Sequence, residues 1–192
     1  MPITVVSGLP RSGTSLVMQM LRAGGMPVLE DNARVADDDN PRGYLEYDKA
    51  RQLWRDATWL DDAVGKAVKI VCPLLRALPF DHDYEVVVIE RDIGEVLASQ
   101  ATMLRRRGED ARQLDAFTEL LAALAYFRRW VELQPNFRCL WLEHRRVLEA
   151  PGEAADAIAR FLDRPLDRVA MSAAVDPGLH RNRLLGLGLA QP

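Results

Sequence analysis

Short apolar runs alternate along the chain with longer segments whose apolar residues recur every three or four positions. The short apolar runs predict β-strands near residues 3–7, 67–71, 85–90 and 138–142. The three- and four-residue spacing predicts helices near residues 14–23, 47–59, 92–106, 110–133, 153–163 and 166–175. This alternation of strands and helices predicts an α/β fold.

The predicted strands have the character of buried, parallel strands. Residues 86–89, Val-Val-Val-Ile, are apolar without interruption, as expected of a strand that helices cover on both faces. We therefore expect a three-layer α/β/α architecture with a central parallel sheet. With 192 residues, 48% of them hydrophobic, and no internal repeat, the chain fits a single domain over residues 1–192.

Charge and composition narrow the possible partners. The formal net charge of −3 argues against non-specific binding to nucleic acid or to an anionic membrane surface. Residues 1–30 lack the pattern of a secretory signal, and no apolar run approaches the roughly 20 residues of a membrane span. These features predict a cytoplasmic protein.

The cysteines and histidines indicate no metal site. Cys72 and Cys139 both lie in apolar segments, so we expect reduced core residues. The three histidines, His82, His144 and His180, are scattered along the sequence, without the short spacing of metal ligands. The Asp37-Asp38-Asp39 run fits a solvated loop.

The first predicted strand leads into a loop with the spacing of a Walker A motif. Gly8 and Gly13 occupy the two glycine positions and Ser15 the Ser/Thr position, but Thr14 stands where the lysine belongs. Backbone N–H groups and a helix N-terminus still form an anion-binding concavity, to which the side chains of Arg11, Ser12, Thr14 and Ser15 add donors. The alternative is a tight turn whose glycines serve backbone conformation alone. The order strand, loop, helix favours phosphate binding.

A second segment follows the third predicted strand. The strand ends in Arg91, and Ser99 comes eight residues later. The alternative here is an arginine paired with Glu90 or Asp92 and a serine packed on a helix. In an open parallel sheet ligands bind at the carboxyl ends of the strands, where this segment, the loop at residues 8–14 and the segment after Val71 converge.

Together the two segments resemble the sulfotransferase superfamily, which binds the donor 3′-phosphoadenosine-5′-phosphosulfate (PAPS). Pro10-Arg11-Ser12-Gly13-Thr14-Ser15 matches the family's P-[KR]-S-G-T-[ST] loop for the 5′-phosphosulfate, and Arg91 and Ser99 have the spacing of its 3′-phosphate motif. Residues 40–46, N-P-R-G-Y-L-E, resemble bacterial members. The resemblance implies the P-loop sulfotransferase fold, PAPS as co-substrate and a small-molecule acceptor. It also implies that Arg181 and Arg183, in a C-terminal tail at residues 177–192, close over the 3′-phosphate.

The chain departs from the family at the catalytic base. Members that sulfate alcohols and phenols have K-x-H-x-P after the second strand, whereas here Lys69 and Pro73 align and Val71 occupies the histidine position. Valine cannot accept a proton. Glu46 is our first candidate for the base, with Glu30 and Asp31 as alternatives, and a salt bridge to Arg42 or a solvated turn is the structural alternative for Glu46.

Two cations complete the expected mechanism. Arg11 is expected to neutralise the 5′-phosphosulfate. Lys69, if it points to the top of the sheet, is expected to stabilise charge that develops on the bridging oxygen, and the alternative is a strand lysine that simply projects its amine from the end of the sheet. Residues 24–65 are expected to form an insertion on the acceptor side, with Tyr44 and Trp54 as candidates for the pocket lining. The identity of the acceptor and the oligomeric state are open.

Two other functions fit parts of the sequence. In a P-loop nucleotide kinase or NTPase, Glu90 after the third strand would imitate a Walker B acid, but Thr14 at the lysine position argues against it. A module that binds a phosphorylated nucleotide without catalysis is consistent with Val71 at the histidine position.

Overall fold

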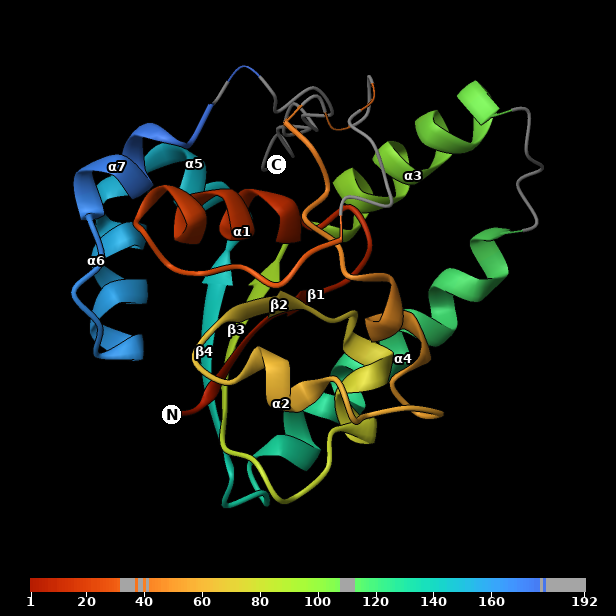
Figure 1. Cartoon of the computed structure of the whole chain (residues 1–192). Coiled ribbons are helices and arrows are strands. Elements are labelled where there is room, and N and C mark those ends of the chain that lie inside the picture. The colour runs from red at the N-terminus through yellow and green to blue at the C-terminus, as the bar shows by residue number, and fades with distance from the viewer. Residues whose placement is uncertain (32–36, 38–39, 41, 108–112, 177, 179–192) are drawn as a thin grey trace, which may run out of the picture.

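The sheet is parallel and has four strands. The computed structural model describes residues 1–31, 37, 40, 42–107, 113–176 and 178, the backbone alone at residues 107, 113–117 and 120. Its strands run in the order β2 (Ala67–Lys69), β1 (Ile3–Gly8), β3 (Tyr84–Glu90), β4 (Phe137–Glu143) (Figure 1). The predicted α/β class and central parallel sheet are confirmed.

The register brings the ends of the strands together. Gly8 at the end of β1 lies opposite Ile89 of β3, and Ile89 lies opposite Leu142 of β4. Val6 lies opposite Lys69, the last residue of β2. The segments that follow the four strands therefore leave the sheet at one edge.

Helices connect the strands. The α-helices are α1 (Thr14–Ala23), α2 (Leu60–Ala63), α3 (Ile93–Arg107), α4 (Gln113–Val131), α5 (His144–Glu149), α6 (Pro151–Leu162) and α7 (Arg168–Ala173). Two 3₁₀ helices, η1 (Asp48–Gln52) and η2 (Cys72–Ala77), precede and follow β2. Five of the predicted helices are confirmed within a few residues, and α2 and α5 were not predicted.

The helix predicted over residues 47–59 is wrong, because only η1 is helical there. Asp56 ends the helical path: its Oδ1 accepts from the Thr58 N–H at 3.0 Å and from the Thr58 hydroxyl at 2.6 Å. The Asp56 carbonyl accepts from the Trp59 indole N–H at 3.0 Å. Such local bonds offer the backbone an alternative to the helix.

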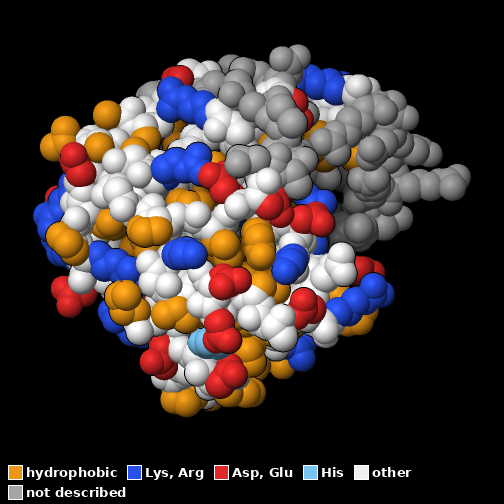
Figure 2. Space-filling model, in the orientation of Figure 1, with side chains coloured by type: hydrophobic (Ala, Val, Ile, Leu, Met, Phe, Trp, Pro, Cys, Tyr) orange, Lys and Arg blue, Asp and Glu red, His pale blue; other side chains and the backbone are white. Residues whose placement is uncertain are grey.

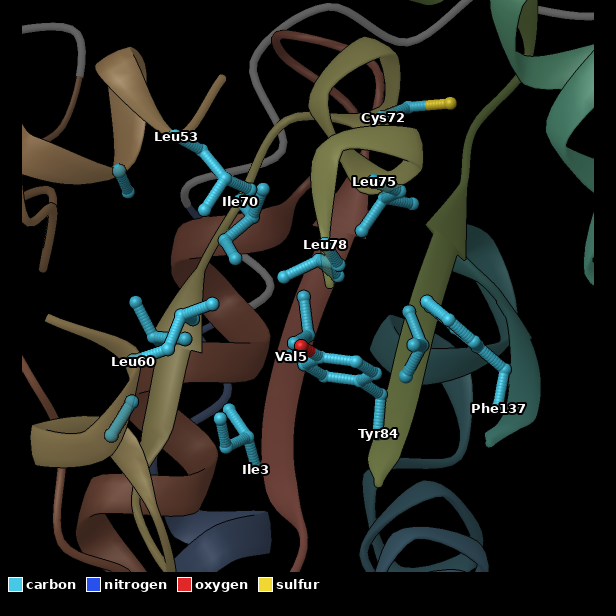
Figure 3. Close-up of a cluster of buried hydrophobic side chains, with 14 of the residues drawn as sticks. Ile3, Val5, Leu53, Leu60, Ile70, Cys72, Leu75, Leu78, Tyr84 and Phe137 are labelled. Carbon is cyan, nitrogen blue, oxygen red and sulfur yellow. The ribbon is translucent and has the colours of Figure 1, made fainter. Parts of the chain in front are cut away.

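Side chains of each strand alternate between two cores. Val86 and Val88 of β3 face a cluster that includes residues of α2, α4, η1 and η2, whereas Val87 and Ile89 face a cluster with α1, α5, α6 and α7. Figure 1 shows these two groups of helices on opposite sides of the sheet, and Figure 3 shows part of the first cluster. The uninterrupted apolar run in β3 thus serves a strand that is covered on both faces.

The cysteines belong to the first cluster. Cys72 is buried, Cys139 is half-buried against it, and both are free thiols. Burial raises the pKa of each thiol to about 12. The prediction of reduced core cysteines is confirmed.

Glu85 provides a test of the core. Burial raises the pKa of its carboxyl, and the Arg138 guanidinium, 3.2 Å from Oε1, opposes this only in part. A carboxyl whose pKa is higher in the folded chain destabilises the fold as pH rises above the unfolded value. Glu85→Gln should therefore increase the free energy of unfolding at about pH 7, and the gain should vanish below about pH 4.

Urea unfolding of wild type and variant at both pH values measures this effect. Glu153→Gln, on a side chain that is 78% exposed, is the matched control and should change little. A gain of equal size at both pH values would show that the charge of Glu85 is not the cause.

Candidate active site

A cavity of about 560 Å³ opens at the carboxyl edge of the sheet. Residues from the ends of all four strands line it: the glycine loop (residues 8–15) after β1, Lys69–Val71 after β2, Arg91 after β3 and His144 after β4. Ser99, Gln100, Thr102, Met103 and Arg106 of α3 add a further wall. The convergence expected from the sequence is confirmed.

Close packing requires glycine at two positions of the glycine loop. Gly8 has φ +155° and Gly13 has φ +109°. A Cβ at Gly8 would lie 2.5 Å from the Ile89 carbonyl oxygen, and a Cβ at Gly13 would lie 2.6 Å from His144 Cδ2. The loop can therefore approach β3 and α5 this closely only because both positions lack a side chain.

The loop presents backbone donors to the cavity. The Ser12 N–H donates to the Leu9 carbonyl at 3.1 Å, and the N–H groups of Leu16 and Val17 donate to the Gly13 carbonyl. No backbone carbonyl in the described part of the chain accepts from the N–H of Gly13, Thr14 or Ser15. These three residues line the cavity at the start of α1, where the anion-binding concavity is expected.

Ser12 is the exception among the predicted loop residues. Pro10, Arg11, Gly13, Thr14 and Ser15 line the cavity, but Ser12 does not. It follows the left-handed Arg11 (φ 69°), and its buried Oγ lies under the loop, 2.5 Å from the position of a Cβ on Gly8. The Ser12 hydroxyl therefore contributes no donor to the cavity in this conformation.

The two sequence motifs contact each other. Arg11 Nε donates to Ser99 Oγ at 3.0 Å, although the residues are 88 positions apart. Arg91 Nη1 donates to the Arg11 carbonyl at 3.3 Å, and Arg91 Nε donates to Glu95 Oε2 at 2.9 Å. Arg91 is thus paired with Glu95, and its guanidinium also braces the glycine loop.

Lys69 joins the cavity wall to the loop. Its ammonium lies 2.9 Å from Glu46 Oε1 and donates to the Tyr44 carbonyl at 2.6 Å and to Ser15 Oγ at 3.2 Å. The side chain is only 7% exposed. These contacts occupy the donor capacity of an ammonium group, so Lys69 holds the segment at residues 44–46 against the start of α1.

Glu46 bridges two cations. Its Oε1 pairs with Lys69, and its Oε2 accepts from Arg51 Nη2 at 2.7 Å. Arg42 instead donates to the Ala174 carbonyl and pairs with Asp176, so neither structural alternative considered for Glu46 holds. The carboxylate is held at the cavity wall by partners from two different elements.

The other acidic candidates lie outside the described lining of the cavity. Glu30 pairs with Arg22. Asp31 Oδ2 accepts from the Asp48 N–H at 2.6 Å. Glu46 is thus the one among the three predicted bases that the fold brings to the cavity.

An apolar wall adjoins Lys69. It consists of side chains from three segments: Tyr47, Ala50, Ile70, Val71 and Leu74. Val71, at the position where the histidine was expected, is 42% exposed. Tyr44 also lines the cavity, but Trp54, which is 63% exposed, does not.

His144 is one of the lining residues that were not predicted from the sequence, as are Arg51 and Arg106. It follows β4 directly, as Arg91 follows β3, and it is only 7% exposed. The carboxyl end of a parallel strand was the available signal. Because the histidines are far apart in the sequence, only the fold shows that His144 lies at this edge of the sheet.

The cavity is more basic than the chain as a whole. Its described lining holds five cations, Arg11, Arg51, Lys69, Arg91 and Arg106, and two anions, Glu46 and Asp176. Figure 2 shows acidic and basic side chains interspersed over the described surface of one face. The positive charge at the cavity is therefore a local feature of a chain whose net charge is −3.

Some predicted features cannot be compared with the structure. Arg181 and Arg183 lie outside the described residues.

Among the described residues there is no group of three or more His, Cys, Asp or Glu side chains suited to a metal ion. None of the described helices has the length and apolar character needed to cross a bilayer.

No protein-family model matches the chain, and no curated protein does. Among solved structures, the chain is similar to an unliganded sugar kinase from Janibacter sp. HTCC2649, at 17% sequence identity and a TM-score of 0.45. The match covers 93% of this chain and 98% of the kinase. A likeness this distant does not indicate an activity.

Gly13 offers a test of the loop geometry. Gly13→Ala should cost about 1–3 kcal/mol of stability, because the new Cβ must displace the loop or His144. For the same reason it should weaken binding of 3′-phosphoadenosine-5′-phosphate, the ligand expected from the sequence, at least about tenfold. Isothermal titration calorimetry and thermal melts measure both effects. Gly25→Ala is the matched control, since Gly25 also has a positive φ (+88°) but nothing within 4 Å of its Cβ position. Wild-type affinity in Gly13→Ala would contradict the assignment.

Proposed function

We propose that this chain is a PAPS-dependent sulfotransferase that moves a sulfuryl group to a hydroxyl or amine of a small-molecule acceptor. The contact between the two motifs carries this proposal. Arg11 of the glycine loop touches Ser99, and Arg91 bonds the Arg11 carbonyl, all at one cavity. A nucleotide with both a 5′- and a 3′-phosphate can engage the two motifs together.

Two observations favour this donor over a nucleoside triphosphate. Thr14 stands at the position of the Walker A lysine, which in P-loop NTPases reaches the β- and γ-phosphates. Glu90, which could imitate a Walker B acid, is outside the described lining and pairs with Arg128 at 2.6 Å. Neither residue supports a metal–triphosphate site.

The proposed reaction is an in-line displacement at sulfur. The acceptor oxygen or nitrogen forms a bond to sulfur as the bond from sulfur to the 5′-phosphate oxygen breaks, and 3′-phosphoadenosine-5′-phosphate leaves. The acceptor's proton goes to a base. Catalysis then rests on positioning and on stabilisation of the negative charge that grows on the leaving phosphate, as in phosphoryl transfer. Arg11 and the N–H groups of residues 13–15 would supply that stabilisation.

Glu46 is the proposed base, and Lys69 holds it. A carboxylate accepts at two oxygens, and Lys69 and Arg51 each contact a different oxygen of Glu46, so the group is held at the cavity wall where an acceptor's proton could reach it. The two cations fix the position of the Glu46 carboxylate beside the apolar wall. The Lys69 ammonium also lies 3.2 Å from Ser15 Oγ, at the start of α1 where the phosphosulfate would bind.

Nucleotide preference tests the donor. We expect 3′-phosphoadenosine-5′-phosphate at about 100 times its Kd to raise the melting temperature by about 5–10 °C without magnesium. ATP with magnesium and 5′-AMP should do much less, because neither fills the 3′-phosphate position. Arg91→Ala should erase the preference, whereas Arg145→Ala should preserve it, since Arg145 is 75% exposed and pairs with Glu149.

The outcomes separate the candidate functions. If ATP with magnesium stabilises the chain most, a divergent nucleotide kinase replaces the sulfotransferase. If no nucleotide raises the melting temperature, both the sulfotransferase function and the nucleotide kinase function are wrong.

Glu46→Gln tests the base. The amide keeps the shape but cannot take the proton, so turnover should fall about 10²–10⁴-fold while nucleotide affinity changes little. Release of 3′-phosphoadenosine-5′-phosphate from PAPS, with a panel of phenols, alcohols and amines, measures turnover. Asp48→Asn is the control, because Asp48 also faces Arg51, at 3.8 Å, but is outside the described lining. Unaltered turnover in Glu46→Gln would exclude Glu46 as the base.

A further inference from the structure

The position of His144 points to a role in anion binding. Its imidazole is buried against the glycine loop: a Cβ on Gly13 would lie 2.6 Å from Cδ2 and 3.3 Å from Nε2. Gly13 carries the first of the three N–H groups that form the anion-binding concavity. The His144 ring therefore lies beside the place where the sequence and the backbone both predict a phosphate.

The glycine loop carries one cation, Arg11, and lacks the lysine of a Walker A loop. Thr14 replaces the lysine that gives a Walker A loop its ammonium group. Lys69 is engaged by Glu46, Tyr44 and Ser15. A protonated His144 imidazole, packed against Gly13, would add a positive charge beside the glycine loop.

The charged groups near His144 bear on how a bound anion would affect protonation of its imidazole. Cations dominate the described cavity lining, and its two carboxylates are paired, Glu46 with Lys69 and Arg51, and Asp176 with Arg42. The elements around His144 also carry charged groups that form ion pairs with one another. These pairs are Arg145–Glu149 and Arg146–Glu153 around α5, Glu90–Arg128 at the end of β3, and Glu95–Arg91 on α3. Glu143, the residue before His144, is exposed. An anion bound in the loop would add a negative charge beside His144 and so favour its charged form.

We propose that His144 is a donor-binding residue that takes up a proton when the glycine loop binds its anion. The bound anion favours the imidazolium, so affinity must rise as pH falls through the titration of His144. Each unit by which the anion raises the His144 midpoint corresponds to about a tenfold difference in affinity between the two pH limits. The proposal rests on the proposed function only for the identity of the nucleotide.

NMR titration of the native protein tests this directly. The Cε1–H signal of His144 is followed from about pH 5.5 to 8.5, with no ligand, with sodium sulfate, and with 3′-phosphoadenosine-5′-phosphate. Sulfate stays dianionic over this range, so its own titration does not interfere. Assignment by elimination, with His82→Gln and His180→Gln, does not require the His144 variant to fold.

We expect both ligands to raise the His144 midpoint, the nucleotide by about one unit or more. The His82 midpoint should not move, because His82 lies beside Asp61 and Asp81, outside the described lining. His144→Gln should bind the nucleotide about tenfold more weakly than wild type at about pH 6 and almost equally at about pH 8.5. An unmoved or lowered His144 midpoint would overturn the proposal.

The same experiment distinguishes this proposal from the proposed function. If sulfate raises the His144 midpoint but the 3′-phosphate gives no advantage over ATP, the role of His144 stands and the sulfotransferase function is wrong. If the nucleotide binds with the expected Arg91 dependence but His144 does not respond, the function stands and this proposal is wrong. Binding of neither ligand overturns both.

Discussion

The site depends on the close approach of the glycine loop to strand β3 and to the start of helix α5. Gly8 passes so near the Ile89 carbonyl, and Gly13 so near His144, that a Cβ at either position would lie within 2.6 Å of another atom. The same loop places residues 13–15, at the start of α1, in the cavity lining, and Arg11 Nε lies 3.0 Å from Ser99 Oγ. Everything proposed for the nucleotide follows from that packing.

A set of ion pairs then fixes the side chains around the loop. Lys69 connects Glu46 and Ser15, and Arg91 connects Glu95 and the Arg11 carbonyl. Buried cations are stable only when paired, so each basic residue positions an acidic or backbone partner as well as itself. The arrangement leaves a basic cavity with one held carboxylate beside an apolar wall, which suits an anionic donor and a proton-donating acceptor.

The parts of this arrangement that are local in sequence could be predicted. Strand β3 contains an unbroken apolar run at residues 86–89, and the glycine spacing marks the loop; each signal lies within a few residues of sequence. The side chain of Ser12 could not be placed, since its direction depends on the left-handed turn at Arg11. His144 was missed because only the parallel register, a tertiary property, brings α5 to Gly13.

The crystal structure of the complex with 3′-phosphoadenosine-5′-phosphate is the most direct test of the central claim, that one cavity holds both phosphates. The account predicts the 5′-phosphate within hydrogen-bond distance of the N–H groups of Gly13, Thr14 and Ser15, and the 3′-phosphate in contact with Arg91 and Ser99. A nucleotide whose 5′-phosphate lies away from the glycine loop, or whose 3′-phosphate faces solvent, would contradict it.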